Sequence, residues 1–306
     1  MSTKNNSRNL KYLIKSLEFF AKYFKKYAIE TELVFVIGRS SDNIEKVIKD
    51  SLNKLYTNFR KIILLKDPGI SLSYSRKLGL DATKGDILIF LDGDMILTID
   101  FASELLKLIK SSNLQAVAPR IIMMPKIQWN KIYNILVENL YEKFHQNEAP
   151  PRVVKREYLK NKPFIPILSR YIFEDQLLLK QLLISNVEIK YNPRLLIFKY
   201  ENPTLSNYFR KHFRYGYGFC NDLKNYALNF VKKEIVIRIF SYLDLIFPIL
   251  TIFTFLTLLF YSRTKINIHE AYMGALLRYT IRLAIFSGHL KCILKKFLNK
   301  WIYAFF

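Results

Sequence analysis

The stretch Ile87-Leu-Ile-Phe-Leu-Asp92-Gly93-Asp94 decides the fold. Five apolar residues followed by a polar turn predict a buried strand that ends at two carboxylates. Two more apolar runs of strand length, Glu32–Ile37 and Lys61–Lys66, precede it. Since the carboxyl ends of strands in open α/β sheets are where ligands bind, we expect the two carboxylates to lie at a functional edge.

Helical patterns alternate with these strands. Apolar residues recur every three or four positions from Leu10 to Phe24, and helices are expected over Ile44–Leu55, Leu72–Ala82 and Phe101–Ile109. The alternation predicts an α/β fold with a mostly parallel sheet and helices on both faces. Further on we expect a strand over Gln115–Ala118, a helix over Phe173–Leu183, strands over Val187–Tyr191 and Leu195–Tyr200, and a helix over Leu205–Tyr226. The proline-rich middle, Met123–Arg170, is expected to cover the edge of a site rather than to build the sheet.

The composition points to a polyanionic partner. Of 306 residues, 48 are Lys or Arg and 25 are Asp or Glu, which gives a formal charge of +23. From Tyr208 onward 15 basic residues face 4 acidic ones, beside long apolar runs. This placement favours an anionic membrane surface over nucleic acid. The two cysteines, Cys220 and Cys292, show neither zinc spacing nor a disulfide framework and fit a reducing, cytosolic setting.

The last quarter of the chain predicts membrane association. Leu245–Ser262 has no charged residue and reaches the minimum length for a spanning helix, although it contains Pro248. Ala271–Leu290 is apolar but carries Arg278 and Arg282, which favours a place in the membrane interface. Basic residues on both sides of these segments predict a protein of the cell membrane, with the α/β domain that precedes them on the cytoplasmic side.

The paired carboxylates suggest metal chemistry. Alternation along the strand sends Asp92 and Asp94 to the same side, and Gly93 leaves room between them. Two such oxygen donors can hold Mg²⁺ or Mn²⁺ while diphosphate oxygens fill the other positions of the ion. The alternative is a polar turn with no function beyond ending the strand.

Several ordered motifs resemble the inverting family 2 glycosyltransferases of the GT-A fold. Gly69-Ile-Ser-Leu-Ser-Tyr-Ser-Arg76-Lys77-Leu-Gly79 is similar to the family's Gly-x-x-x-Ala-Arg-Asn-x-Gly helix, and it leads into the Asp-x-Asp strand. Glu174-Asp175-Gln176 matches the family's Glu-Asp pair at a helix start. Tyr208-Phe-Arg210-Lys-His-Phe-Arg214-Tyr-Gly216 is similar to its Arg-x-x-x-Arg-Tyr-Gly segment. The resemblance spans roughly residues 3–220.

This resemblance implies roles for single residues. Asp92 and Asp94 would hold the metal and, with Arg76, Arg210 and Arg214, would bind the diphosphate of the donor. Asp175 would be the general base, and a helix N-terminus beside another carboxylate suits that task. Ordinary helix-end charge for Asp175, and a solvated basic face for Arg210 and Arg214, remain alternatives.

The implied partners are a UDP-, GDP- or dTDP-sugar donor, a lipid-linked or saccharide acceptor and the anionic membrane, but no nucleic acid. Residues 1–230 would form the catalytic domain and residues 231–306 a membrane-associated helical region.

Three departures from the family pattern stand out. Ser2-Thr3-Lys4-Asn5-Asn6 is similar to the turn that follows the family's first strand, so we expect that strand to be missing and Glu32–Ile37 and Ile87–Leu91 to lack their shared neighbour. Ile37 replaces an aspartate that would touch the base or ribose. The family's histidine after the last core strand is absent, with Lys199 or Tyr200 near its place.

Two other function classes stay open from the sequence. Haloacid-dehalogenase-type phosphatases also end a strand with Asp-x-Asp and would use Asp92 as nucleophile, although they place Thr or Val where this chain has Ile96. A basic, membrane-anchored binding protein without enzymatic activity is the second class.

Overall fold

The chain divides into two units. The computed structural model describes residues 2–3, 7–38, 42–111, 114–124, 129–134, 150–159, 174–200, 204–222, 242, 251–252, 255–256 and 268–305. The first unit comprises Met1–Met124, Lys143–Arg170 and Leu178–Glu201. The second comprises Pro125–Glu142, Tyr171–Leu177 and Asn202–Phe306.

A parallel three-stranded sheet opens the first unit. Its order is β1 (Ser2–Thr3), β2 (Glu32–Ile37) and β3 (Lys61–Lys66), and β2 is buried from its second residue to its last. The expectation that the first strand is missing is wrong, because β1 pairs in parallel with β2. It is only two residues long, however, and reaches only Val36 and Ile37.

A five-stranded sheet completes the unit, and it is mixed. Its order is β4 (Ile87–Ile89), β7 (Val153–Lys155), β6 (Ala116–Met123), β8 (Ile189–Lys199) and β5 (Met95–Leu97). Only β6 and β8 pair in parallel, and the other three ladders are antiparallel. The prediction of a mostly parallel sheet is therefore wrong here. The cause is two three-residue strands, β5 and β7, which are too short to leave a pattern in the sequence and pair against their neighbours' direction.

The strand β7 also corrects the interpretation of the proline-rich middle. It lies between β4 and β6 and so builds the sheet. The two strands expected over Val187–Tyr191 and Leu195–Tyr200 are one, β8, whose register against β6 shifts between Pro119 and Arg120.

A cavity separates the two sheets. Among the described residues β2 and β4 do not pair with each other, and a cavity of about 650 Å³ is lined by both of them. Apolar side chains of the flanking helices, such as Phe20 and Leu80, close its walls. Among the described residues β2 and β4 also lack a shared neighbour, as expected, because β1 pairs with β2 and not with β4.

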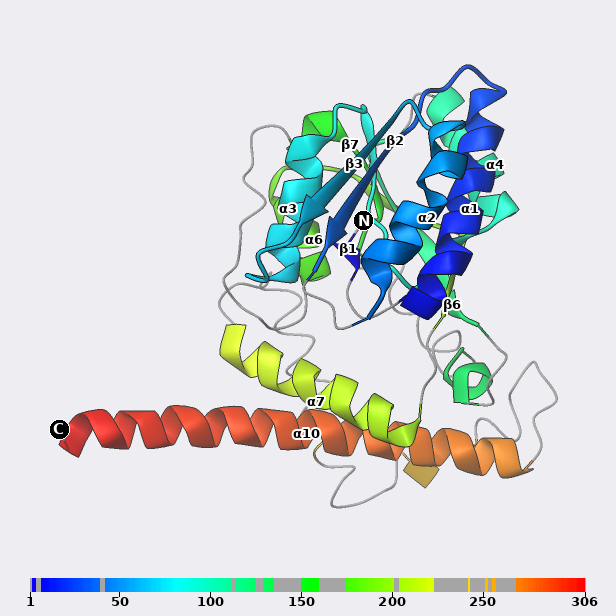
Figure 1. Cartoon of the computed structure of the whole chain (residues 1–306). Coiled ribbons are helices and arrows are strands. Elements are labelled where there is room, and N and C mark those ends of the chain that lie inside the picture. The colour runs from blue at the N-terminus through cyan, green and yellow to red at the C-terminus, as the bar shows by residue number, and fades with distance from the viewer. Residues whose placement is uncertain are drawn as a thin grey trace. The chain divides into compact units, whose positions relative to one another are not determined.

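Helices cover both faces of the strands, as predicted. In Figure 1, α1 (Ser7–Lys25), α2 (Ile44–Tyr56) and α4 (Ile99–Lys110) lie on one side, and α3 (Leu72–Ala82) and α6 (Glu174–Ile184) lie on the other. The apolar stripe of α1 is buried, which explains its three- and four-residue spacing. At the start of α3 the Ser71 side chain accepts a hydrogen bond from the amide of Tyr74, and this cap fixes where the helix begins.

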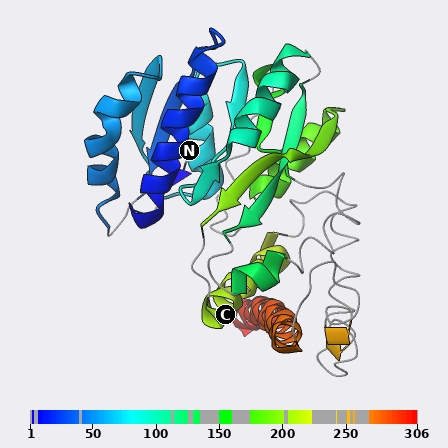
Figure 2. The same ribbon diagram turned by 90° about the vertical axis from the view of Figure 1, so that its right-hand side faces the viewer.

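Two helices dominate the second unit. Figures 1 and 2 show α7 (Leu205–Asp222) lying against the 38-residue α10 (Ile268–Phe305). The contact is close enough to exclude side chains at two points. A Cβ atom at Gly216 would clash with the carbonyl group of Ile285, and one at Gly288 would clash with the carbonyl group of Phe213. Glycine is therefore required at both positions for packing.

The structure describes only one of the two predicted membrane segments in full. Leu245–Ser262 lies outside the described residues except for positions 251–252 and 255–256. Ala271–Leu290 forms the first part of α10, where burial lowers the pKa of Arg278 and lowers that of Arg282 to about 10. In the described part of the chain, no helix combines the length and the apolar character needed to cross a bilayer.

The glycine contacts make a prediction. Gly216→Ala and Gly288→Ala should each destabilise the α7–α10 pair by about 2 kcal/mol or more, because the backbones must separate to admit a methyl group. The measurement is the midpoint of thermal unfolding. Gly79→Ala is the control, since its Cβ would meet only the Val36 side chain at 3.5 Å, inside a helix. Unchanged midpoints in both test variants would contradict the packing argument.

Candidate active site

The two carboxylates lie in the turn between β4 and β5. The amide of Met95 donates to the carbonyl oxygen of Asp92 at 3.1 Å and closes the turn. The side chains of Asp92 and Asp94 are 22% and 18% exposed, so both are accessible from solvent although largely enclosed. The strand expected before the two carboxylates is confirmed as β4.

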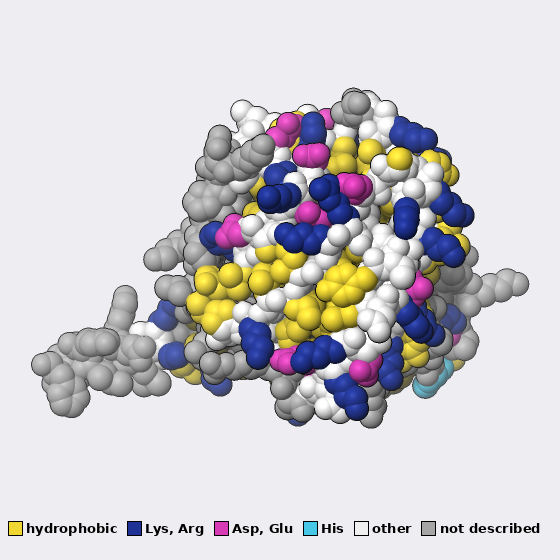
Figure 3. Space-filling model, turned by 45° about the horizontal axis from the view of Figure 1, so that its top comes forward, with side chains coloured by type: hydrophobic (Ala, Val, Ile, Leu, Met, Phe, Trp, Pro, Cys, Tyr) yellow, Lys and Arg dark blue, Asp and Glu magenta, His cyan; other side chains and the backbone are white. Residues whose placement is uncertain are grey.

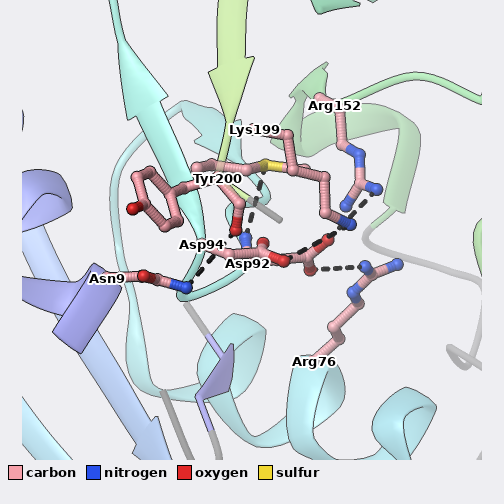
Figure 4. Close-up of polar contacts among 8 residues, drawn as sticks. Asn9, Arg76, Asp92, Asp94, Arg152, Lys199 and Tyr200 are labelled. Atoms are coloured by element: carbon pink, nitrogen blue, oxygen red, sulfur yellow. Dashed lines mark hydrogen bonds and ion pairs between the residues drawn. The ribbon is translucent and has the colours of Figure 1, made fainter. Parts of the chain in front are cut away.

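Two buried arginines hold Asp92, as Figure 4 shows. Arg76 of α3 donates to one carboxylate oxygen at 3.1 Å, and a terminal nitrogen of Arg152 lies 3.4 Å from the other. The backbone of Arg152 is fixed by the amide of Phe90, which donates to its carbonyl at 2.8 Å, and by its own amide, which donates to Val117 at 3.0 Å. Helix α3, the β4 end and the start of β7 therefore meet at one carboxylate.

A lysine faces the second carboxylate. The Nζ atom of Lys199, the last residue of β8, lies 3.6 Å from Oδ2 of Asp94. The next residue binds the same turn, because the amide of Tyr200 donates to the carbonyl of Asp94 at 2.7 Å. The Asn9 side chain donates to the Tyr200 carbonyl at 3.3 Å, and the Tyr12 ring stacks on the Tyr200 ring at 5.6 Å.

These charges set the ionisation of Asp92. Burial alone would raise the pKa of its carboxyl group. The positive charges of Arg152, Arg76 and Lys199, together with the Arg76 hydrogen bond, outweigh burial and hold that pKa well below its usual range. Asp92 is therefore ionised at every pH at which the protein is expected to work.

The residues around the carboxylates do not suit a divalent metal ion. Arg76, Arg152 and Lys199 offset the charges of Asp92 and Asp94 and leave an excess of one positive charge. An ion bound to Asp94 would lie close to the Lys199 ammonium group, and their repulsion is of the order of several kcal/mol. Over the residues that the structure describes, no group of three His, Cys, Asp or Glu side chains could complete a coordination shell.

A second cavity opens at the carboxyl ends of β2 and β3. It has a volume of about 960 Å³ and is lined by Ile37, Gly38, Asp42, Asn43, Glu45, Lys46, Lys49, Asp50, Lys66, Asp67 and Pro68. The Ser75 hydroxyl donates to the Asp67 carboxylate at 2.6 Å. Because Ser75 precedes Arg76 on α3, this cavity is linked to the carboxylate site through one helix.

The other predicted site residues lie in the second unit. Asp175 is the second residue of α6 and is half-buried. Arg210 and Arg214 are exposed one turn apart on α7, where Arg214 Nε donates to the Arg210 carbonyl at 3.4 Å. The structure thus brings Arg76, Asp92 and Asp94 together in the first unit.

Arg152 and Lys199 belong to the site but were not among the predicted site residues. Nothing in the sequence marks Arg152, which follows two prolines in the irregular middle. Lys199 had a signal, since it stands near the place of the family histidine.

One face of the molecule shows how its charged side chains are distributed. On the face shown in Figure 3, Lys and Arg side chains are interspersed with acidic and hydrophobic ones and do not form a single stripe. Such a pattern on this face does not favour a nucleic-acid track.

Comparisons with known proteins agree with this fold. The family model described as Glycosyl transferase family 2 matches residues 1–170. The crystal structure of S. aureus TarS is 16% identical, with a TM-score of 0.48, and the match covers 94% of this chain and 53% of that one. This chain therefore spans about half the length of that protein. A search of curated proteins found no match.

Two further solved structures are similar. S. aureus TarS 1-349 in complex with UDP is 14% identical, with a TM-score of 0.50 and coverage of 94% of this chain and 90% of that one. Glucosyl-3-phosphoglycerate synthase from Mycobacterium tuberculosis, in complex with Mn²⁺, UDP and glucosyl-3-phosphoglycerate, is 16% identical, with a TM-score of 0.45 and coverage of 73% and 78%. At 14% identity and a TM-score of 0.50, the likeness to TarS 1-349 concerns the fold alone.

The arginine contacts predict the effect of Asp92→Asn. The change leaves two buried guanidinium groups without their counter-charge and should lower the free energy of unfolding by about 3 kcal/mol. Because the folded pKa of Asp92 is lowered, its contribution is present above about pH 4 and is lost as the pH falls further. The difference between the wild type and the variant should therefore shrink towards about pH 3.

Denaturant unfolding at several pH values measures this difference. Asp81→Asn is the control, since Asp81 pairs with Lys77 on the surface. A wild-type unfolding midpoint for Asp92→Asn near neutral pH would refute the structural role of the pair.

Proposed function

The chain belongs to glycosyl transferase family 2, and we propose that it moves a sugar from a nucleoside-diphosphate sugar onto a lipid-linked or saccharide acceptor at a membrane. The observation that carries the proposal is the cluster of Arg76, Arg152 and Lys199 around Asp92 and Asp94 at the end of β4. A site with a positive excess, walled by carboxylates that orient the cations, suits a diphosphate.

The donor occupies two connected places in this proposal. The nucleoside lies in the cavity at the ends of β2 and β3, and its diphosphate extends past α3 to the basic cluster. The hydrogen bond between Ser75 and Asp67 supports this path, because it ties the cavity wall to the helix that carries Arg76. Arg210 and Arg214, exposed on α7, remain candidates for a further diphosphate contact. UDP-, GDP- and dTDP-sugars are the donors to consider.

Transfer is a displacement at the anomeric carbon. The acceptor hydroxyl oxygen forms a bond to that carbon on the face opposite the diphosphate, and the bond to the diphosphate oxygen breaks, so the configuration inverts. The electron pair leaves with the nucleoside diphosphate. Asp175 takes the acceptor proton, and its place in the first turn of α6 supports the role because a helix N-terminus stabilises a carboxylate.

In this proposal the protein binds its acceptor at an anionic membrane surface on the cytoplasmic side of the cell. Supporting this, α10 exposes Leu290, Ile293 and Leu294 beside Lys291 and Lys295. Exposed apolar side chains flanked by lysines are typical of a helix that lies in the interface. In this proposal residues 1–230 form the catalytic region and residues 231–306 the membrane-associated region.

A donor screen tests the function. Protein incubated with UDP-, GDP- and dTDP-sugars and membrane extracts should release nucleoside diphosphate and label an acceptor with one of them. Asp175→Asn should bind that donor as the wild type does, yet lose transfer by about 10²–10⁴-fold, because it keeps the size of the side chain but cannot accept a proton. Equal loss of donor affinity and transfer would exclude the base assignment.

Membrane contact is tested on α10. Ile293→Glu should weaken co-sedimentation with vesicles that contain anionic lipid by roughly tenfold, since burial of an apolar side chain is replaced by burial of a negative charge. Ile184→Glu is the matched control, because Ile184 is also highly exposed but lies at the end of α6. Equal binding by both variants and the wild type would show that α10 is not the contact.

A further inference from the structure

Lys199 is held at the carboxylates by the sheet itself. In the sheet, Lys199 pairs with Met95 of β5 on one side and with Met123 of β6 on the other. The amide of Met124 donates to its carbonyl at 2.9 Å, and the amide of the following Tyr200 donates to Asp94. Since β8 is fixed from both sides up to this residue, the Lys199 side chain starts from a rigid base beside the Asp92–Asp94 turn.

The ammonium group also has access to a ligand. The Lys199 side chain is 19% exposed and Asp94 is 18% exposed, whereas Arg76 and Arg152 are almost fully buried. The two arginines are occupied with the two oxygens of Asp92. Lys199 is thus the cation of this cluster that combines contact with Asp94 and exposure to solvent.

We propose that the Lys199 ammonium group takes the place of a divalent cation, so that this chain transfers sugar without a metal ion. The inference rests on the proposed function. The three positive charges of the cations already exceed the two negative charges of the carboxylates. A protonated amine also cannot serve as a metal ligand. The ammonium group faces the diphosphate instead. It stabilises the charge that the diphosphate gains when its bond to the anomeric carbon breaks.

Lys199→His is the decisive variant. Histidine is a metal ligand and carries no fixed charge at neutral pH, so beside Asp94 it should create a site for Mn²⁺. In equilibrium dialysis the variant should bind Mn²⁺, and a further Asp94→Asn change should abolish that binding. Wild-type protein should bind no Mn²⁺ that depends on Asp94. Lys190→His, on the exposed part of the same strand, is the matched control and should gain no such site.

The proposed role of Lys199 also predicts how nucleotide binding and sugar transfer respond to a metal ion. The wild type should bind its nucleoside diphosphate, and transfer sugar, equally well in EDTA and in Mn²⁺. Lys199→Ala should reduce transfer by about 10²–10³-fold in EDTA. The Lys199→His variant should be inactive in EDTA and regain activity with Mn²⁺.

The outcomes separate this inference from the proposed function. Wild-type transfer that stops in EDTA and returns with Mn²⁺ would overturn the role of Lys199 but leave the transferase intact. Binding of UDP, GDP or dTDP in EDTA without transfer of any sugar would support the metal-free site and reject the function. If none of the three binds with or without Mn²⁺, the donor site itself is wrong and the inference falls with it.

Discussion

Arg76 and Arg152 reach the carboxylate of Asp92 from two separate segments of the chain, and three elements of the first unit meet at that contact. Arg76 belongs to α3, Asp92 lies in the turn between β4 and β5, and Arg152 leads into β7. Burying two guanidinium groups carries a large desolvation cost that only a well-placed carboxylate offsets. The position of α3, the β4–β5 turn and the pairing of β7 therefore depend on one another. The contact is better suited to fixing a geometry than to adding stability.

The sequence predicts the elements that carry a long periodic signal. The longer elements between Ser7 and Lys110 fall close to their expected bounds. The apolar stripes of α1, α2 and α4 and the apolar run of β2 are buried, although β3 has no fully buried residue. The strands β5 and β7 are different. Three residues leave no period, and their direction is decided by the neighbours they pair with. The fold class was therefore predictable, while the mixed character of the second sheet was not.

The residues of the candidate site also divide into those that the sequence predicts and those that it does not. Asp92 and Asp94 were predictable because they follow a buried apolar run and come directly after the motif that contains Arg76. Arg152 comes from a proline-rich segment and reaches Asp92 only because β7 pairs with both β4 and β6. Lys199 lies about a hundred residues beyond Asp94 and reaches it through the pairing of β5 with the end of β8. Tertiary pairing, not local sequence, therefore brings Arg152 and Lys199 to the carboxylates, whereas Arg76 belongs to a motif that the sequence itself shows.

The glycine of the Arg-x-x-x-Arg-Tyr-Gly segment shows how one motif can combine two physical demands. Gly216 lies where α7 meets α10, and the backbone of Ile285 leaves no room there for a side chain. Arg210 and Arg214 on the same helix are exposed. A helix whose small residue is committed to packing while its arginines stay accessible can present two positive charges from a fixed backbone. The structure therefore assigns Gly216 to the packing of α7 and leaves Arg210 and Arg214 exposed to solvent.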